Sequence, residues 1–427
     1  MTAETVGAVT RGEVMRRTRE KAAGRPAQGG RRADLALLGA VLALLVVGLN
    51  MVYSASFVVA RDNPSFGSDV YFLMRQLTWA ALGGAALALT AWVDYRRWRP
   101  LAAPLLGLTA LLLLAVLFSN LGRTAYGAQR WLALEPLPAV QPSELAKLAL
   151  VLYCADRLAH RQGRLHRLDL GFLFLALVLL GVAGLIMAQP DFGTSLVVVA
   201  TVAGLLFLAG ARLPHLAGGI AIGGAALASL ATSAGYRAQR LAAFFHSSED
   251  PLGIGWHTSQ ASIALGSGGL VGLGLGASRQ KFYYLYGAHT DSIFAVIGEE
   301  LGLIGTLAVL ALFVLVAYRG CLIALRAPDT FGMLLAAGIT FWITFQALTN
   351  IAVVTSTVPF TGIPLPFVSF GGSSLVVSLA AVGLLLNISR AQSEPGSRPH
   401  EAPRATPGLR RRTVGAPGRR PAGERLG

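Results

Sequence analysis

The segment AHTDSIFAVIGEELGLIG, residues 288–305, opens with a charged motif and continues as a long apolar stretch. It places three carboxylates, those of Asp291, Glu299 and Glu300, at the start and inside of a helix of membrane-crossing length. A carboxylate in hydrocarbon costs roughly 3 kcal/mol or more, so it persists mainly where it faces a polar cavity. We therefore expect this segment to hold the chemistry of the protein.

The composition extends this reading to the whole chain of 427 residues, which is 54% hydrophobic and 13% charged. The charged fraction is about half that of a typical soluble protein. The apolar residues gather in blocks of about 20, the length of helix that crosses ~30 Å of hydrocarbon. Lipid offers no hydrogen-bond partners to the backbone. Apolar segments of this length therefore cross it as helices, which pair their own N–H and C=O groups. The sequence predicts an all-α polytopic membrane protein with about ten transmembrane helices, at 35–58, 71–93, 100–118, 143–159, 169–188, 193–210, 215–233, 291–317, 331–355 and 372–389.

The net charge of +15 is concentrated in the two tails. Residues 1–33 carry eight Lys and Arg, and residues 388–427 carry nine Arg. Both tails are poor in apolar residues, which predicts disorder over 1–33 and 391–427 on either side of a membrane domain over 34–390. Such basic flanks are typical of contact with anionic lipid on the cytoplasmic side rather than of nucleic-acid binding.

The loops orient the spans, because arginine-rich short loops mark the cytoplasmic side. Arginines at 96–99, 157–167, 212 and 319–326 all fall on the side of the two tails, so both termini are expected in the cytoplasm. Two long connections, 119–142 and 234–290, then lie outside, the second as a large extracellular loop between spans 7 and 8. Its many glycines argue against a regular domain. Cys154 and Cys321 are expected to be free thiols.

Polar residues gather at the outer membrane margin. Glu144 and Lys147 are three residues apart on one helix and can pair, either as a neutral packing pair or as the wall of an anion-binding cavity. Asp191 opens a helix, where a carboxylate can serve as a cap or as a functional group. Gly371-Gly372-Ser373-Ser374 opens the last span after a proline-rich stretch, and amides with hydroxyls at a helix start attract phosphate.

Asp291 begins its helix and should remain ionised there. That state suits a base aimed at a sugar hydroxyl, or a ligand of a divalent cation, and Thr290 is a candidate cap. Glu299 lies about 80° around the helix and about 12 Å deeper, and Glu300 faces the side opposite Asp291. A structural role for the two glutamates in helix packing and a functional one both stay open.

Five ordered motifs over 34–390 resemble the SEDS proteins (shape, elongation, division and sporulation), which include FtsW and RodA. The motifs are RWL with QPSELAKL, QPDFGTS, GWHTSQASIALGSGGLVGLGLGASRQK, AHTDSIFAVIGEELG and NIAVVTSTVPFTGIPLPFVSFGGSSL. The resemblance implies ten spans and a peptidoglycan glycosyltransferase that polymerises lipid II outside the cytoplasmic membrane. The motif AHTD and the basic tails look most like the septal, FtsW-type branch. A RodA-like elongation polymerase, a lipid II flippase and a non-catalytic divisome scaffold are the alternatives.

The resemblance also implies roles for single residues. Asp291 would be the catalytic acid that deprotonates the acceptor sugar, and a candidate ligand of Mg²⁺ or Mn²⁺. A class B penicillin-binding protein would be the activating partner, among other divisome proteins. Tyr286-Gly287 and Ser292 depart from the family's pattern around this motif. The candidate substrate-binding residues are Arg130, Glu144, Lys147, Asp191, Arg240, Lys281, His289, Thr290 and Ser373, of which the four cations are expected to stabilise the leaving pyrophosphate.

Overall fold

A computed structural model describes residues 33–119, 122–125, 128–133, 139–161, 170–211 and 255–391, with a few single positions between 214 and 223. All of these belong to the compact unit that ends at Glu394. The expected span at 215–233, the first part of the expected loop 234–290 and most of the two basic tails lie outside the described residues.

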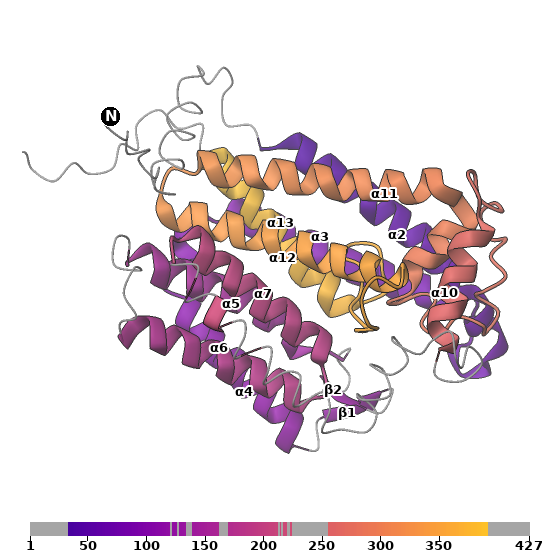
Figure 1. The fold of residues 1–427 in the computed structure, drawn as a ribbon, viewed down its shortest axis with the longest axis horizontal. Coiled ribbons are helices and arrows are strands. Elements are labelled where there is room, and N and C mark those ends of the chain that lie inside the picture. The colour runs from indigo at the N-terminus through magenta and orange to yellow at the C-terminus, as the bar shows by residue number, and fades with distance from the viewer. Residues whose placement is uncertain are drawn as a thin grey trace, which may run out of the picture. The chain divides into compact units, whose positions relative to one another are not determined.

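Helices make up most of the described chain (Figure 1). Every expected span within the described residues forms a helix, and α11 continues to Arg326 rather than ending near 317. Carboxylates cap several starts: Asp34 accepts from the amide of Leu37 at 3.0 Å, and Asp329 from that of Gly332 at 2.7 Å. The helices are α2 (Leu35–Asp62), α3 (Tyr71–Trp92), α4 (Ala102–Phe118), α5 (Pro142–Ala159), α6 (Leu170–Ala188), α7 (Phe192–Leu208), α10 (Trp256–Ser267), α11 (Ile293–Arg326), α12 (Thr330–Val354) and α13 (Gly372–Ala391).

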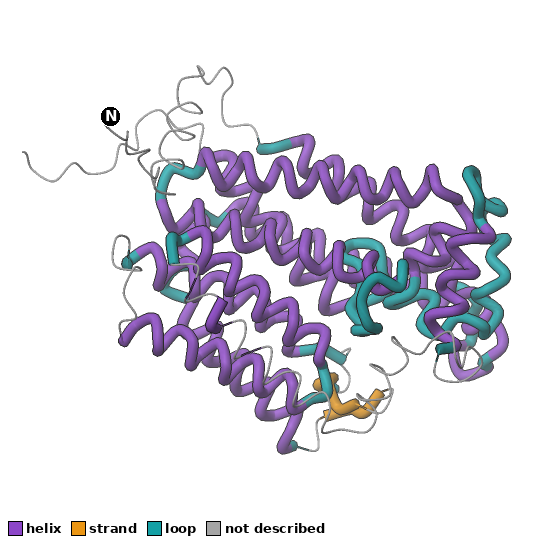
Figure 2. Tube along the Cα trace, in the orientation of Figure 1, coloured by secondary structure: helices purple, strands orange, loops and turns teal. Residues whose placement is uncertain are grey.

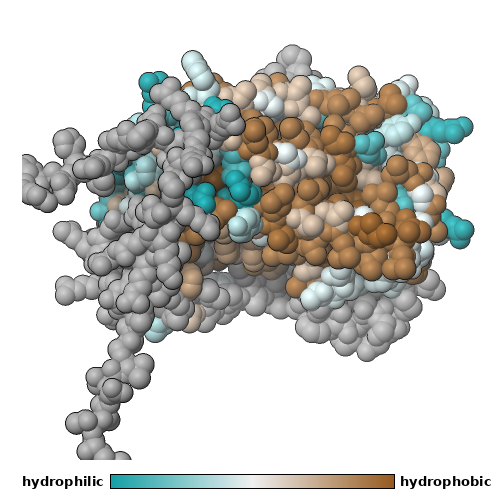
Figure 3. Space-filling model, turned by 90° about the horizontal axis from the view of Figure 1, so that it is seen from above, coloured by the Kyte–Doolittle hydropathy of each residue, from teal (hydrophilic) through white to brown (hydrophobic). Residues whose placement is uncertain are grey.

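Five helical stretches in the described part are long and apolar enough to cross a membrane: Leu35–Asp62, Pro64–Trp92, α11, α12 and α13. Ala102–Phe118, Leu173–Ala188 and Phe192–Leu208 are apolar but shorter. Figure 3 shows one face of the molecule as a broad apolar band with hydrophilic residues toward its two ends. Large exposed side chains such as Val46, Ile304 and Val314 fit such a surface. The protein is a multi-pass membrane protein.

Small residues let the helices approach closely. The most extensive contact is between α3 and α13, and α11 packs on both α12 and α2. A Cβ atom on Gly383 of α13 would lie 2.0 Å from Oγ1 of Thr90 on α3, and the same hydroxyl donates to the carbonyl of Ala380 at 2.8 Å. Close backbone approach with side-chain hydrogen bonds is the usual way helices associate in lipid.

The first long connection contains a hairpin that the sequence analysis did not predict (Figure 2). Strands β1 (Gly122–Ala125) and β2 (Ala128–Leu132) pair antiparallel, with Arg123 opposite Trp131 and a bulge next to that pair. Leu132 also exchanges backbone hydrogen bonds with Val140, of 2.8 and 2.9 Å. The hairpin brings β2 to the start of α5.

Helix α11 is broken at Gly302, whose φ of 67° and ψ of −164° are open to glycine but strained for other residues. The break leaves backbone groups of α11 without partners inside the helix, and the segment 269–274 satisfies them. Leu303 N donates to the carbonyl of Gly269 at 2.9 Å, and Leu273 N donates to the carbonyl of Glu299 at 2.9 Å. A regular helix over 291–317 was therefore the wrong expectation: a short buried helix, 293–301, precedes the break.

The described part of the expected loop 234–290 is also more ordered than its glycines indicated. It contains α10, which packs against α11, and the segment 268–281, which fits into the break of α11. Much of the connection is thus integrated into the helix bundle rather than standing apart from it.

Candidate functional site

Asp291 lies in the turn just before α11 and is half-buried. The helix begins at Ile293 with Ser292 at its N-cap position, so Asp291 sits one residue before the cap. The hydroxyl of Thr290 donates to Oδ1 of Asp291 at 3.0 Å and to the carbonyl of Gly287 at 3.1 Å. Thr290 therefore orients the carboxylate of Asp291. The expectation that Thr290 caps the helix is wrong, since no side chain caps α11.

Gly287 gives this turn its shape. Its φ is +66°, and a Cβ atom placed on it would lie 2.2 Å from Oδ1 of Asp291. A residue with a side chain would therefore displace the carboxylate. Ser292, the second departure from the family pattern, donates to the carbonyl of Tyr286 at 3.0 Å, and its hydroxyl lies 2.9 Å from Nε2 of His257 in α10. Both departures thus take part in holding the turn.

His289 packs between two aromatic rings. Its ring centroid lies 4.7 Å from that of Phe72 and 5.7 Å from that of Phe370. Burial lowers the pKa of His289 to about 4. The imidazole is therefore neutral at physiological pH, and it shapes the wall beside Asp291 rather than supplying positive charge.

The proline-rich segment 355–371 is non-helical, as its prolines predicted, and it borders Asp291. The side-chain nitrogen of Asn350 in α12 donates to the carbonyls of Asp291 and Ile363, each at 2.7 Å. A Cβ atom on Gly362 would lie 3.6 Å from Oδ2 of Asp291. Asn350 was not among the predicted site residues, because nothing in its local sequence shows which carbonyls it reaches.

The same segment reaches the start of α7 on its other side. A Cβ atom on Gly193 would lie 2.7 Å from the carbonyl oxygen of Thr361 and 2.5 Å from Cγ1 of Ile363. Residues 361–363 therefore stand between Asp291 and the cluster around Asp191.

Arg130, Asp191 and Ser373 meet in that cluster. Arg130 of β2 donates from Nε to the carbonyl of Gln189 at 3.1 Å and also bonds the carbonyl of Pro190, and its Nη1 lies 3.9 Å from Oδ1 of Asp191. Asp191 caps α7 by accepting from Thr194 N at 3.1 Å, which confirms the capping reading.

Gln141 connects this cluster to α13. Its side-chain amide donates to Oδ2 of Asp191 at 3.1 Å, and its backbone amide donates to the Ser373 hydroxyl at 3.0 Å. Three predicted residues from β2, α7 and α13 thus form one polar network at the start of α5. The Arg130 side chain is 22% exposed, so part of it remains accessible.

Glu144 and Lys147 form the expected pair, with 2.7 Å between Nζ and Oε2 and side chains only 2–3% exposed. Lys147 also donates to Oε1 of Gln346 at 2.8 Å, and Gln346 donates to the carbonyl of Pro364 at 2.9 Å. The pair is buried and its charges neutralise each other. It contacts the segment 355–371 through Gln346, which bonds the carbonyl of Pro364.

Lys281 and the two glutamates of α11 form a separate buried group. Nζ of Lys281 lies 3.0 Å from Oε1 of Glu300, and both side chains are fully buried. Ser54 of α2 donates to Glu300 at 2.6 Å, and Glu299 accepts from the amide of Arg279 at 2.8 Å. Both glutamates therefore bind the segment 276–281. Lys281 has no exposed side-chain surface and its contacts are those of a structural pair, while its expected role at the pyrophosphate stays a prediction.

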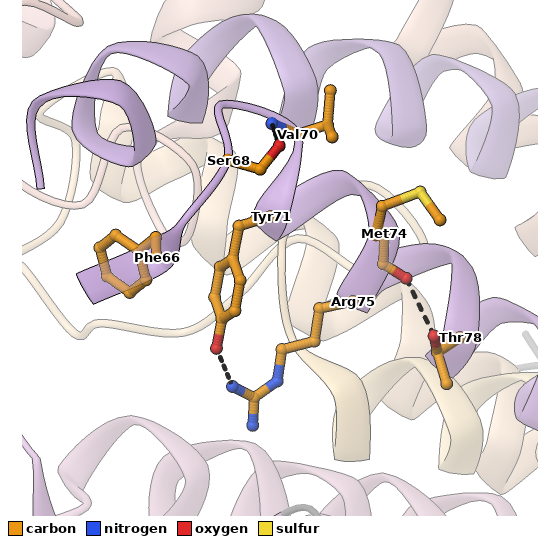
Figure 4. Close-up of a pocket in the computed structure, with 7 residues that line it drawn as sticks. All are labelled: Phe66, Ser68, Val70, Tyr71, Met74, Arg75 and Thr78. Carbon is orange, nitrogen blue, oxygen red and sulfur yellow. Dashed lines mark hydrogen bonds between the residues drawn. The ribbon is translucent and has the colours of Figure 1, made fainter. Parts of the chain in front are cut away.

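An open pocket of about 540 Å³ lies at the start of α3 (Figure 4), and it was not predicted from the sequence. Arg75 donates to the hydroxyl of Tyr71 at 2.7 Å, and both side chains line this space. The neighbouring Phe72 contacts His289, which places this basic residue on the same side of the bundle as Asp291. Arg240, the remaining predicted cation, lies outside the described residues.

The described residues hold no group of three or more His, Cys, Asp and Glu side chains suited to a metal ion. Asp291, whose side chain is oriented by the Thr290 hydroxyl, could offer one carboxylate to a metal ion. Mg²⁺ is commonly held by one or two carboxylates together with substrate phosphates and water. This carboxylate therefore fits one position in the coordination of such an ion. Both cysteines are free thiols.

Comparison with known proteins identifies the family of the chain. The family model described as "Cell cycle protein", for FtsW, RodA and SpoVE, matches residues 35–394. The protein named "Probable peptidoglycan glycosyltransferase FtsW" from Trichlorobacter lovleyi is 44% identical over 83% of this chain and 93% of its own.

Two solved structures share the fold. The rod shape determining protein RodA of Thermus thermophilus has a TM-score of 0.62 and 31% identity, over 85% of this chain and 98% of its own. A second, titled "Structural coordination of polymerization and crosslinking by a peptidoglycan synthase complex", has a TM-score of 0.67 and 31% identity, over 85% and 99% of the two chains. A match of this extent, in sequence and in fold, shows that the chain belongs to the FtsW/RodA/SpoVE family of cell cycle proteins.

Proposed function

We propose that Asp291 is the catalytic base of a glycosyl transfer that lengthens peptidoglycan strands from lipid II. The protein is a peptidoglycan glycosyltransferase, as its FtsW relatives are named. The observation that carries the assignment to Asp291 is its setting: a half-buried carboxylate oriented by Thr290, held through its backbone by Asn350 and bordered by glycine backbone.

The reaction follows from that carboxylate. Asp291 takes the proton from the 4-hydroxyl of the acceptor N-acetylglucosamine as its oxygen bonds to the anomeric carbon of the donor chain. The bond from that carbon to the pyrophosphate oxygen breaks, and undecaprenyl pyrophosphate leaves with the electron pair. A single displacement inverts the donor's α-linkage to β.

The leaving pyrophosphate needs positive charge or hydrogen-bond donors. Lys147 and Lys281 are buried and paired with glutamates, which leaves Arg130 as the accessible one of the three predicted cations that the structure describes. Asp291 would supply one ligand to a Mg²⁺ or Mn²⁺ ion carried by the substrate, and such an ion would offset pyrophosphate charge.

The topology is part of the proposal. Ten spans with both basic tails in the cytoplasm place Asp291, Arg130 and Ser373 at the outer margin, where lipid II would be polymerised. Basic ends at Arg96, Arg99 and Arg319 support this orientation, since Arg319 pairs with Asp34 next to the N-terminal tail. The similarity to a peptidoglycan synthase complex and to FtsW proteins supports a class B penicillin-binding protein as partner and a place at the division septum.

The test is glycan polymerisation by the purified protein with its cognate transpeptidase, labelled lipid II and Mg²⁺ or Mn²⁺. Asp291→Ala and Asp291→Asn should give no polymer while folding normally. Asp69→Asn is the control, because Asp69 is exposed on the connection before α3. Polymer from Asp291→Ala at the wild-type rate would exclude Asp291 as the base. No polymer from the wild type with an active partner would favour lipid transport or a scaffold role.

A further inference from the structure

A groove runs between α4, α5 and α6. These three helices lie side by side and contact one another in pairs (Figure 1). The groove has a volume of about 610 Å³ and is lined by apolar side chains such as Leu106, Val182 and Leu185, with Tyr153 and Arg157 of α5 as its polar residues.

Two glycines leave the groove open. Gly107 of α4 and Gly181 of α6 both line it, and a Cβ atom on either would meet no other atom within 4 Å. The flanking surfaces of the same helices are strongly apolar: Leu111 is 65% exposed and Leu177 is 64% exposed. Exposed leucines beside an apolar groove are typical of a surface that faces acyl chains.

Arg157 lies in the last turn of α5, where it lines the groove. Its guanidinium carbon sits 5.2 Å from the ring centroid of Tyr153, one turn earlier on the same helix face. Arg99 nearby is neutralised by Asp156 at 2.6 Å. In contrast, no acidic side chain pairs with Arg157 in the part of the chain that the structure describes. Within the described residues, a cation thus stands at one end of an apolar groove without an acidic partner.

We propose that this groove binds an anionic phospholipid of the leaflet next to the arginine-rich loops, which is the cytoplasmic leaflet. One acyl chain lies along Gly107 and Gly181, and the lipid phosphate pairs with Arg157. The match is one of charge and shape, because an amphiphile with one anion at one end fits a groove with one cation at one end. A guanidinium suits phosphate through its planar fork of donors.

The experiment measures lipid binding to the full-length protein in detergent by native mass spectrometry, with dioleoylphosphatidylglycerol and dioleoylphosphatidylcholine titrated separately. The wild type should bind the anionic lipid at least tenfold more tightly than the zwitterionic one. Arg157→Ala should remove that preference. Gly181→Leu should weaken both lipids at least tenfold, and it should fold normally because the space it enters is empty.

Two controls match these variants. Arg326→Ala removes a basic residue from the last turn of α11, and Gly84→Leu adds a side chain on α3 where no atom lies within 4 Å. Both should bind lipid like the wild type. Wild-type lipid binding by Arg157→Ala and Gly181→Leu would overturn the proposal. So would displacement of the anionic lipid by millimolar inorganic phosphate, which would indicate an ion site. Weaker association of Gly181→Leu with the cognate transpeptidase, at unchanged lipid binding, would overturn it in favour of a helix-docking groove. None of these readouts depends on polymerisation, so they are separate from the test of Asp291.

Discussion

The side-chain nitrogen of Asn350 donates a hydrogen bond of 2.7 Å to the backbone carbonyl of Asp291. Asn350 is 1% exposed, and its second bond, to Ile363, fixes the segment that borders the Asp291 carboxylate. The buried side-chain amide of Asn350 therefore fixes the position of Asp291 relative to the segment 355–371.

Asn350→Ala should lower the turnover number for glycan polymerisation about 100-fold with little change in KM, because a small displacement of a reacting group costs rate more than binding. Steady-state kinetics with lipid II checks this. Thr349→Val is the matched control, since the Thr349 hydroxyl bonds the carbonyl of Phe345 within its own helix. If both variants lost turnover equally, the loss would come from altering α12 in general and not from the hydrogen bond to Asp291.

Gly287→Ala should inactivate the enzyme more than it destabilises the fold. The added Cβ would stand 2.2 Å from Oδ1 of Asp291, so the carboxylate must move. A left-handed φ at a residue with a side chain costs about 1–2 kcal/mol in addition. Gly210→Ala separates the two effects, because Gly210 has φ of +98° and free space around its Cβ position. Both variants should lose similar melting temperature, and Gly287→Ala alone should lose polymerisation. Full activity of Gly287→Ala would mean that the carboxylate tolerates displacement.

Lys281 and Glu300 should behave as a structural pair. Lys281→Met leaves Glu300 charged and fully buried, which typically costs about 3–5 kcal/mol. The double variant Lys281→Met with Glu300→Gln should recover most of the lost melting temperature, because no uncompensated charge remains. It should also recover polymerisation. A stable but inactive double variant would instead return Lys281 to the role of a substrate-binding cation.

The helices were predictable because their signals are local. Blocks of apolar residues mark their positions to within several residues, and Asp34, Asp191 and Asp329 cap the starts of three of them. The break at Gly302 was not predictable, because its backbone groups find partners some 30 residues earlier, in the segment 269–274. A glycine within an apolar run carries no sign of such an exchange.

In the candidate site, too, local contacts were predictable and long-range contacts were not. The pair of Glu144 and Lys147 lies on one helix, so its spacing alone predicted the contact. Lys281 was expected at the pyrophosphate because it is a cation in the glycine-rich loop. Its actual environment includes Ser54, which lies 227 residues away in the sequence. Which cation is buried and which is accessible depends on such long-range contacts, and sequence patterns do not contain them.

His289 should make the fold sensitive to acid. Burial lowers its pKa to about 4, whereas an unfolded chain has an imidazole pKa of about 6.5. Between these values the unfolded state binds more protons, so the free energy of unfolding rises with pH. The contribution is present above pH 6.5 and is lost as the pH falls toward 4, up to about 3 kcal/mol. Thermal melting of the purified protein in detergent between pH 7 and 4.5 measures it.

The comparison that isolates this residue is the slope of melting temperature against pH. His289→Gln should have a shallower slope than the wild type over this range, because its side chain does not titrate, even if its melting temperature is lower throughout. Asn50→Gln is the control, since Asn50 is exposed on α2 and neither side chain titrates. If wild type and His289→Gln lost stability in parallel, the packing of His289 against Phe72 and Phe370 would not keep the imidazole neutral, and the proton uptake would belong to other groups.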